Sequence, residues 1–316
     1  MPHLSIARLF EDNREKLKLE WLAGRGGGMR QLNSDHITDA SKGLIGHLNF
    51  IHPNLIQVVG PSEARYLDSL DPAVCRRILE ELVTRELACF IAAGMESVPA
   101  ILDEVVETAR VPLFRSPVTS VELMWMLRPY LARALAESVT SHGVFLDVLG
   151  MGVLITGASG VGKSELGLEL ISRGSGLIAD DVVEFYRIGP ETIEGRCPAL
   201  LRDFLEVRGL GVLNVRSVFG EAALRPRKNL KLIVHLERPA RAGDLAPPLE
   251  RLPLRPGSEE IMGVPIGKVT IPVAAGRNLA VLTETAVRNR VLQLRGIDST
   301  TEFIERQSQQ MNGDQQ

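Results

Sequence analysis

The sequence predicts an α/β protein with a small N-terminal α/β domain, residues 1–130, and a second domain, residues 131–316. Three observations support this prediction. The chain has 316 residues, which is enough for two domains of ordinary size. Hydrophobic residues make up 45% of it, as in a globular protein with a substantial core. Strand and helix patterns alternate along both halves, which is typical of α/β folds.

The first half contains a predicted strand–helix–strand unit. Residues 88–93 form an apolar run typical of a buried strand, 98–109 have helical periodicity, and 112–114 form a second strand. Apolar spacing and capping residues predict further elements: a helix over 4–23 ended by Gly24, a strand over 55–59, a helix begun by Asp71-Pro72, and a helix capped by Ser120 that kinks or restarts at Pro129. We identify no chemical constellation in this half.

The second half begins with two apolar strands, 144–149 and 153–156, joined by a glycine-rich turn. A glycine-rich loop and a helix ending at Arg173 follow. The later elements are a strand over 177–179, short strands up to residue 273, and a helix capped by Thr283 that ends at Arg295. The chain from Arg306 onward is polar, and we expect it to be frayed.

Composition excludes several classes of protein. The net charge of −3 does not favour nucleic acid as a partner. The three cysteines are scattered, as in a reduced cytosolic protein. Charged residues interrupt the N-terminus, and there is no apolar run of membrane-spanning length, so we expect neither a signal peptide nor a membrane span. The predicted location is the cytoplasm.

A phosphate-binding loop is the most specific feature of the sequence. The residues Gly157, Ala158, Ser159, Gly160, Val161, Gly162, Lys163 and Ser164 match the pattern G-x-x-x-x-G-K-[ST] in full. Glycines allow backbone N–H groups to surround phosphate oxygens, and the following helix presents its positive end. Lys163 adds a charge for the outer phosphates, and the Ser164 hydroxyl can bind Mg²⁺. A strand before the loop and a helix after it are the required context.

A phosphoryl-transfer site also needs an acid near the metal, and the sequence offers two candidates. Asp180-Asp181 follows the strand 177–179, and Glu237 follows another apolar run. We favour the aspartates, because adjacent carboxylates are costly without a cation or a catalytic role. The segment EVRGLGVLNV, residues 206–215, is either part of the site or a glycine bend in a hairpin. His142 is likewise either functional or structural.

Four segments together resemble the HPr kinase/phosphorylase family of bacteria. They are HGVFLDVLGMGVLITG at 142–157, the loop with Asp180-Asp181, EVRGLGVLNV at 206–215 and IPVAAGRNLA at 271–280. The resemblance extends into the first half through IQVVG at 56–60 and through 67–72. It implies an enzyme that phosphorylates a serine of the phosphocarrier HPr with ATP or pyrophosphate. It also implies removal of that phosphate by phosphorolysis, a catalytic core like that of phosphoenolpyruvate carboxykinase, Mg²⁺ as cofactor and a homohexamer.

The resemblance also implies roles for individual residues. Ser164 and Glu206 would hold Mg²⁺, and Asp181 would take the proton from the serine hydroxyl and return it in the reverse reaction. Lys163 and His142 would act in the active site. Arg251 would be catalytic, although Leu249-Glu250 precedes it where the family has a tyrosine and an acid. The segment assigned to dephosphorylation comprises Pro272, Val273, Ala274, Ala275, Gly276 and Arg277.

Two other functions remain open on the same core. A small-molecule kinase or carboxykinase-like enzyme would need a closed substrate pocket, whereas residues 238–257 are rich in Arg, Pro and Gly and favour a mobile protein-docking segment. A nucleotide-dependent switch without catalysis is the third hypothesis. An Asn-Lys-x-Asp motif is missing from the sequence, which disfavours a GTPase.

Overall fold

The computed structural model of the protein describes residues 3–33, 43–238 and 257–313. The chain divides into two compact units, Met1–Glu137 and Ser138–Gln316. The predicted domain boundary at 130/131 falls within helix α6 (Ser120–Ala134), shortly before this division. Both units combine helices with a β-sheet, so the mixed α/β class predicted from the sequence is confirmed.

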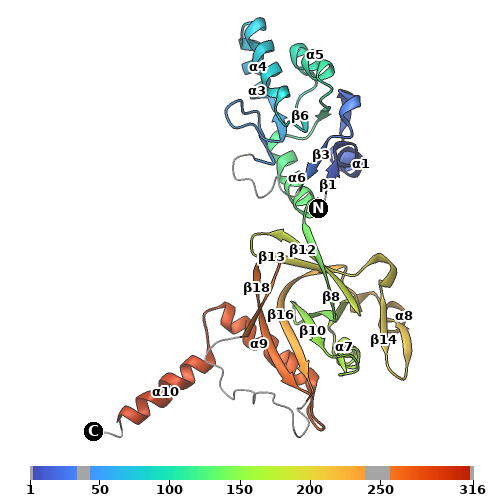
Figure 1. The fold of residues 1–316 in the computed structure, drawn as a ribbon, viewed down its shortest axis with the longest axis vertical. Coiled ribbons are helices and arrows are strands. Elements are labelled where there is room, and N and C mark those ends of the chain that lie inside the picture. Colours follow the sequence, from blue (N-terminus) through green and yellow to red (C-terminus); the bar gives the residue numbers. More distant parts are fainter. Residues whose placement is uncertain (1–2, 34–42, 239–256, 314–316) are drawn as a thin grey trace. The chain divides into compact units, whose positions relative to one another are not determined.

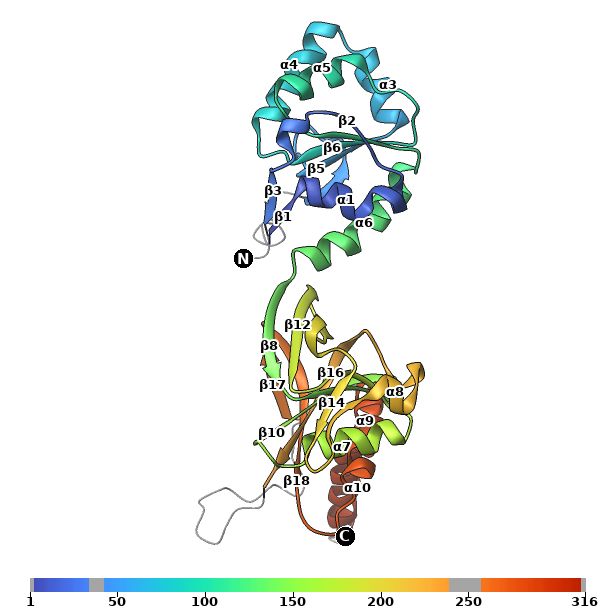
Figure 2. The same cartoon turned by 90° about the vertical axis from the view of Figure 1, so that its right-hand side faces the viewer.

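The N-terminal unit is a five-stranded sheet between two layers of helices (Figure 2). The strand order is β2-β7-β6-β5-β4, with β4 to β7 parallel to one another and β2 antiparallel at the edge. The elements of this unit are β1 (His3–Ser5), α1 (Ile6–Leu17), β2 (Glu20–Ala23), β3 (Gln31–Asn33), β4 (Ile45–His47), β5 (Ile56–Val59), α3 (Pro61–Ser69), α4 (Pro72–Thr84), β6 (Cys89–Ala93), α5 (Ala100–Thr108), β7 (Leu113–Ser116) and α6.

The central strands of this sheet are buried on both faces because helices cover both. Along β6, Cys89 and Ile91 point into the core shared with α1 and α6, whereas Phe90 points into the core shared with α3, α4 and α5. This alternation follows from the two-residue period of a strand. The predicted strand–helix–strand unit is confirmed as β6, α5 and β7, and the predicted helix after Asp71 as α4, with Asp71 as its N-cap.

The larger unit is built on a nine-stranded mixed sheet, drawn from green to red in Figure 1. The main strand order is β11-β9-β10-β16-β13-β12-β8, and β18 pairs with β16 and with β17. The elements are β8 (Glu137–His142), β9 (Val144–Val148), β10 (Met151–Gly157), α7 (Lys163–Ser172), β11 (Gly176–Ala179), β12 (Val182–Gly189), β13 (Thr192–Arg196), β14 (Phe204–Val207), β15 (Gly211–Asn214), α8 (Val215–Phe219), β16 (Arg227–Glu237), β17 (Gly257–Ile261), β18 (Val264–Pro272), α9 (Leu279–Leu294) and α10 (Ser299–Gly313).

Helices α7 and α9 pack on one face of this sheet through a shared apolar core that includes Leu166, Leu170 and Val287. Gly167 allows α7 to approach closely, since a Cβ there would lie 3.0 Å from Val144 Cγ1 on β9. The helix after the phosphate loop is therefore held firmly against the sheet.

Four sequence predictions about individual elements are wrong. The helix predicted over 4–23 ends at Leu17, because Lys18 adopts φ 49° and residues 20–23 join the sheet as β2. Thr119, not Ser120, caps α6, which is helical through Pro129. Asn278 caps α9, and Thr283 lies buried inside that helix. The polar residues from Arg306 to Gly313, predicted to be frayed, continue helix α10, and residues 314–316 lie outside the described residues.

Candidate active site

One edge of the larger sheet collects the residues of the candidate site. Strands β10, β16 and β18 are parallel, so their carboxyl ends meet at the same edge. Gly157 pairs with Leu236 there, and Glu237 pairs with Pro272. The phosphate loop, residues 157–164, leaves β10 at this edge and leads directly into α7. The predicted strand–loop–helix context is therefore present, and ligands of open α/β sheets bind at such edges.

The loop conformation requires its glycines. Gly157, Gly160 and Gly162 have φ values of 142°, 68° and 103°, a region that side chains disfavour. A Cβ on Gly157 would also lie 2.5 Å from the Leu236 carbonyl oxygen. Lys163 Nζ donates hydrogen bonds to the Gly157 and Ala158 carbonyls at 3.0 and 3.2 Å, which holds its positive charge against the start of the loop.

A pocket of about 470 Å³ opens beside the loop. Its lining combines loop residues, the two predicted aspartates and the hairpin β14–β15: Ser159, Gly160, Gly162, Lys163, Ser164, Glu165, Asp180, Asp181, Glu206, Val207, Arg208, Gly209 and Gly211. Four carboxylates and two cationic side chains therefore share this space. A polyphosphate would add further negative charge, so the pocket favours a bound cation along with it.

Asp180 connects three parts of the site. The Ser164 hydroxyl donates to Asp180 Oδ1 at 3.3 Å, and the backbone N–H of Glu206 donates to Asp180 Oδ2 at 2.8 Å. The side chain is buried, and this desolvation raises the pKa of Asp180 above its ordinary value, although the hydrogen bonds that it accepts oppose the shift. Asp180 thus fixes the end of the phosphate loop relative to the hairpin.

Asp181 and His142 lie together at the rim of the site. His142 Nδ1 is 3.2 Å from the Asp181 carbonyl oxygen and 3.8 Å from Asp181 Oδ1, and both side chains are exposed. The backbone N–H of Gly143 also donates to the Asp181 carbonyl at 3.1 Å. Asp181 adopts φ 66°, an uncommon conformation for a residue other than glycine, and its side chain is exposed whereas the neighbouring Asp180 is buried. Both residues predicted from the sequence are therefore brought together.

The segment 206–215 forms a hairpin of β14 and β15, in which Glu206 pairs with Val212. The glycine bend considered in the sequence analysis is present, and the same hairpin supplies Glu206 and Arg208 to the pocket lining. The two interpretations of this segment are therefore compatible. Glu237, the other acid candidate, is not among the residues that line the pocket.

Comparisons with known proteins cover nearly the whole chain. Two family models match it: HPr Serine kinase N terminus over residues 4–131 and HPr Serine kinase C-terminal domain over residues 133–307. The HPr kinase/phosphorylase of Nitrosomonas europaea is 57% identical over 313 residues, which cover 99% of this chain and 96% of that protein. The chain belongs to the HPr kinase/phosphorylase family.

A second family member, the HPr kinase/phosphorylase of Chromobacterium violaceum, is 54% identical over 97% of this chain and 95% of its own length. The solved structure of the Hpr(Ser) kinase/phosphatase from Coxiella burnetii has 37% identity and a TM-score of 0.46, and it covers 52% of this chain and 98% of that chain. Among the described residues, no helix is long and apolar enough to cross a membrane.

Two arginines lie near the loop for which the sequence predicted no role. Arg208 reaches Gly160 from the hairpin, and Arg238 reaches it from the end of β16. The motif 206–215 contained Arg208, but only the folded chain brings Arg238 to the loop. Arg251, the predicted catalytic arginine, lies outside the described residues.

The predicted dephosphorylation segment, residues 272–277, starts at the same sheet edge as the phosphate loop. The backbone N–H of Val273 donates to the Glu237 carbonyl at 2.8 Å, and the N–H of Arg277 donates to the Ala274 carbonyl at 3.2 Å, which closes a turn. Strand β16 separates this segment from the loop, so its start lies about 10 Å away, twice the spacing of neighbouring strands. The Arg277 side chain is exposed.

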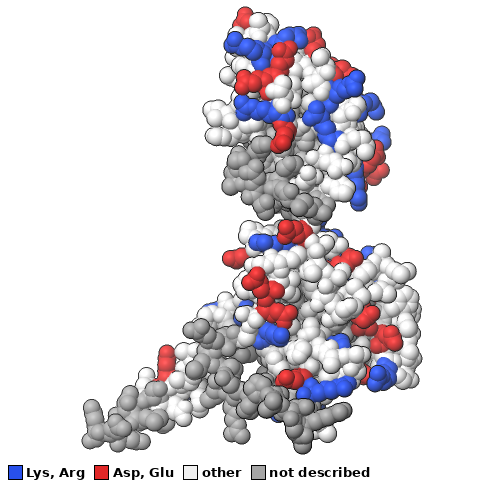
Figure 3. Space-filling view, in the orientation of Figure 1, with Lys and Arg blue, Asp and Glu red and all other residues white. Residues whose placement is uncertain are grey.

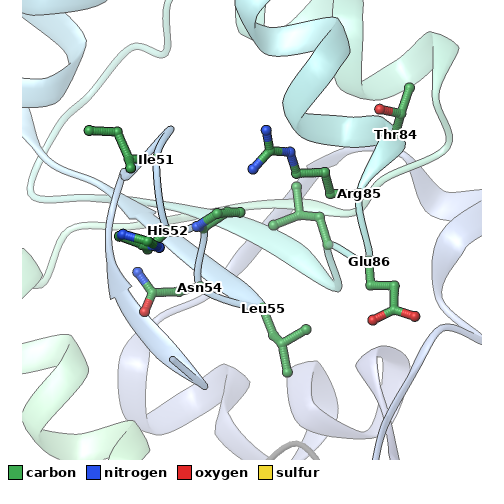
Figure 4. A pocket seen from close by; sticks show the side chains of 9 residues that line it. Ile51, His52, Asn54, Leu55, Thr84, Arg85 and Glu86 are labelled. Atoms are coloured by element: carbon green, nitrogen blue, oxygen red, sulfur yellow. The ribbon is translucent and has the colours of Figure 1, made fainter. Parts of the chain in front are cut away.

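Another hollow, of about 420 Å³, lies within the N-terminal unit (Figure 4). His52 and Asn54 lie on one side of it, with Arg85 and Glu86 on the other. Asn54 already donates to the His47 carbonyl, and Arg85 pairs with Glu81. Acidic and basic side chains are mixed over this unit (Figure 3). These contacts account for Asn54 and Arg85 without a ligand.

Proposed function

We propose that this chain phosphorylates a serine hydroxyl of HPr and removes the same phosphate by phosphorolysis, which releases pyrophosphate. The observation that carries the proposal is the complete phosphate loop beside Asp180 and Asp181, in a chain whose full-length relatives are named HPr kinase/phosphorylase. The proposed donor is ATP or pyrophosphate. A homohexamer and a core like that of phosphoenolpyruvate carboxykinase belong to the same proposal and rest on the family resemblance.

The residues present suit Mg²⁺ as the cation. Ser164 and Glu206 would supply oxygen ligands, and Asp180 accepts hydrogen bonds from the Ser164 hydroxyl and from the Glu206 backbone N–H. Among the described residues, no group of three His, Cys, Asp or Glu side chains forms a metal cage. Mg²⁺ fits such an incomplete set, since it commonly takes one or two protein ligands together with phosphates and water. When bound, it would neutralise charge on the transferring phosphoryl group.

The proposed chemistry needs one protein base. Asp181, exposed at the pocket, takes the proton from the serine hydroxyl as the serine oxygen forms its bond to phosphorus and the bond to the donor breaks. In the reverse direction phosphate attacks phosphoserine, and Asp181 returns the proton to the serine oxygen. Lys163 and the loop N–H groups hold the phosphates in both directions, and His142 positions Asp181.

Transfer of labelled phosphate tests the proposal. The purified chain is incubated with Mg²⁺, HPr and either labelled ATP or labelled pyrophosphate, and HPr without its acceptor serine serves as the control. We expect label on intact HPr only, and release of pyrophosphate when phosphate is added to phosphoserine-HPr. Label on a small molecule alone would favour the small-molecule kinase, and nucleotide binding without transfer would favour the switch.

A further inference from the structure

We infer that Arg238 is a positioning residue for the phosphate loop, and that it sets how well the loop holds a donor without a nucleoside. This inference rests on the proposed function. Arg238 directly follows β16, the strand that pairs with β10 below the loop. Its Nη2 donates to the carbonyls of Ser159 and Gly160, at 3.0 and 2.9 Å. Arg238, which is not part of the phosphate loop, therefore holds the tip of that loop through two hydrogen bonds.

The Ser159 and Gly160 carbonyls, which accept these hydrogen bonds, belong to a tight turn. The N–H of Val161 donates to the Ala158 carbonyl at 3.2 Å, and Gly160 has φ 68° at the third position of this turn. A peptide plane carries its C=O and the next N–H in opposite directions. Because Arg238 holds the Ser159 carbonyl, the N–H of Gly160 is held facing away from Arg238. The contact thus fixes the direction of a loop N–H group.

Arg208 approaches the same tip from the hairpin. A Cβ on Gly160 would lie 3.2 Å from both Arg208 terminal nitrogens and 3.4 Å from Arg238 Nη2, so the two guanidinium groups approach one point. No carboxylate in the described parts of the chain pairs with either group at this tip. Two like charges in such proximity are unfavourable alone and become favourable beside an anion. The two guanidinium groups of Arg208 and Arg238 therefore favour the binding of a phosphate at the loop tip.

The affinities for the two proposed donors, pyrophosphate and ATP, should depend on the Arg238 hydrogen bonds to different extents. Pyrophosphate has only its phosphates to bind, so the loop supplies most of its affinity. ATP also has a nucleoside, which adds binding contacts beyond the phosphates. A less rigid loop tip should therefore weaken the binding of pyrophosphate more than the binding of ATP. A general loss of folding would weaken the binding of both donors alike.

Binding measurements on three variants of the full-length chain test the inference. Arg238→Ala removes both hydrogen bonds to the loop carbonyls. Arg238→Lys restores a donor, because both bonds come from one nitrogen and an ammonium has three N–H groups. Arg227→Ala is the matched control at the other end of β16, where Arg196 still pairs with Glu194. Calorimetry with Mg²⁺ gives the Kd for pyrophosphate and for ATP, and thermal unfolding gives Tm.

We expect Arg238→Ala to raise the Kd for pyrophosphate roughly tenfold, the scale of a lost charge-assisted hydrogen bond, and the Kd for ATP less. Arg238→Lys should recover most of the loss, and Arg227→Ala should bind as the unsubstituted chain does. Equal losses for both donors, or no loss, would overturn the inference. Pyrophosphate binding without transfer to HPr would overturn the proposed function alone, and no phosphate binding by the unsubstituted chain would overturn both.

Discussion

The Ser164 hydroxyl donates to Asp180 Oδ1 at 3.3 Å, which joins the last residue of the phosphate loop to the acid that follows strand β11. The other carboxylate oxygen accepts from the backbone of Glu206. Both metal-ligand candidates are thus connected through one buried carboxylate. Its ionisation therefore affects both the stability of the unit and the geometry of the proposed metal site.

The first prediction concerns the pH dependence of stability at Asp180. Burial raises its folded pKa above 3.8, so the folded state binds this proton more tightly than the unfolded state does. The ionised carboxylate therefore lowers the free energy of unfolding, and this loss grows as pH rises from 3.8 through the folded pKa. Asp180→Asn removes this cost. Its Tm relative to the unsubstituted chain should increase over that interval, measured with a chelator present.

The same variant should lose activity at neutral pH, because the amide cannot hold Ser164 and Glu206 as the carboxylate does. A Tm difference between Asp180→Asn and the unsubstituted chain that stays constant with pH would show that Asp180 has an ordinary pKa in the folded protein. Ser172→Ala, on the same helix as Ser164, is a suitable control for the pH series.

The second prediction concerns the proton acceptor. Asp181→Asn should retain nucleotide binding and lower the transfer rate roughly a hundredfold or more, which is the scale of general-base catalysis. Asparagine tolerates the φ of 66° at this position about as well as aspartate, so the backbone should not change. Single-turnover rates with saturating ATP, together with nucleotide affinity, provide the check. Lost binding with an unchanged rate per bound nucleotide would refute the role.

The third prediction concerns Glu206 as a metal ligand. Glu206→Gln should raise the Mg²⁺ concentration needed for half-maximal activity, because a neutral amide is a poorer ligand for a hard cation. The backbone hydrogen bond from residue 206 to Asp180 should persist. A Mg²⁺ titration of transfer to HPr measures the effect, with the exposed Glu169→Gln on α7 as control. If the Mg²⁺ titrations of both variants superimpose, Glu206 is not a metal ligand and has only a structural role in the hairpin.

The fourth prediction separates the two directions of the reaction at Arg277. Phosphorolysis needs a free phosphate held in line with phosphoserine, and an arginine fork suits this small anion. ATP is already held by the loop and Lys163. Arg277→Ala should therefore lower the rate of phosphorolysis much more than the rate of phosphorylation, and raise the phosphate concentration required.

Both rates and Tm should be measured on one preparation of Arg277→Ala. If Arg277 only stabilises the turn after β18, both activities should fall together with Tm. That result would assign the residue to folding and not to phosphate binding.

Local patterns were sufficient wherever the physical cause is itself local. The loop needs glycines at positions with positive φ and a helix that begins at Lys163, and both are visible in eight consecutive residues. The buried strand β6 follows from an apolar run that begins after Glu86 and ends before Gly94. The helix predicted over 4–23 failed because apolar spacing does not reveal that Lys18 turns left-handed and that the next residues pair with β7.

By itself, the sequence determined the α/β class, the phosphate loop and the family, because these depend on neighbouring residues or on motifs in a given order. Only the tertiary structure joined Glu206 to Asp180 across 26 positions, Asp181 to His142 across 39, and Arg238 to Ser159 across 79. Periodicity reports which face a residue occupies within its own element. The parallel pairing of β10 with β16 decides which strand ends meet, and therefore which side chains share the site.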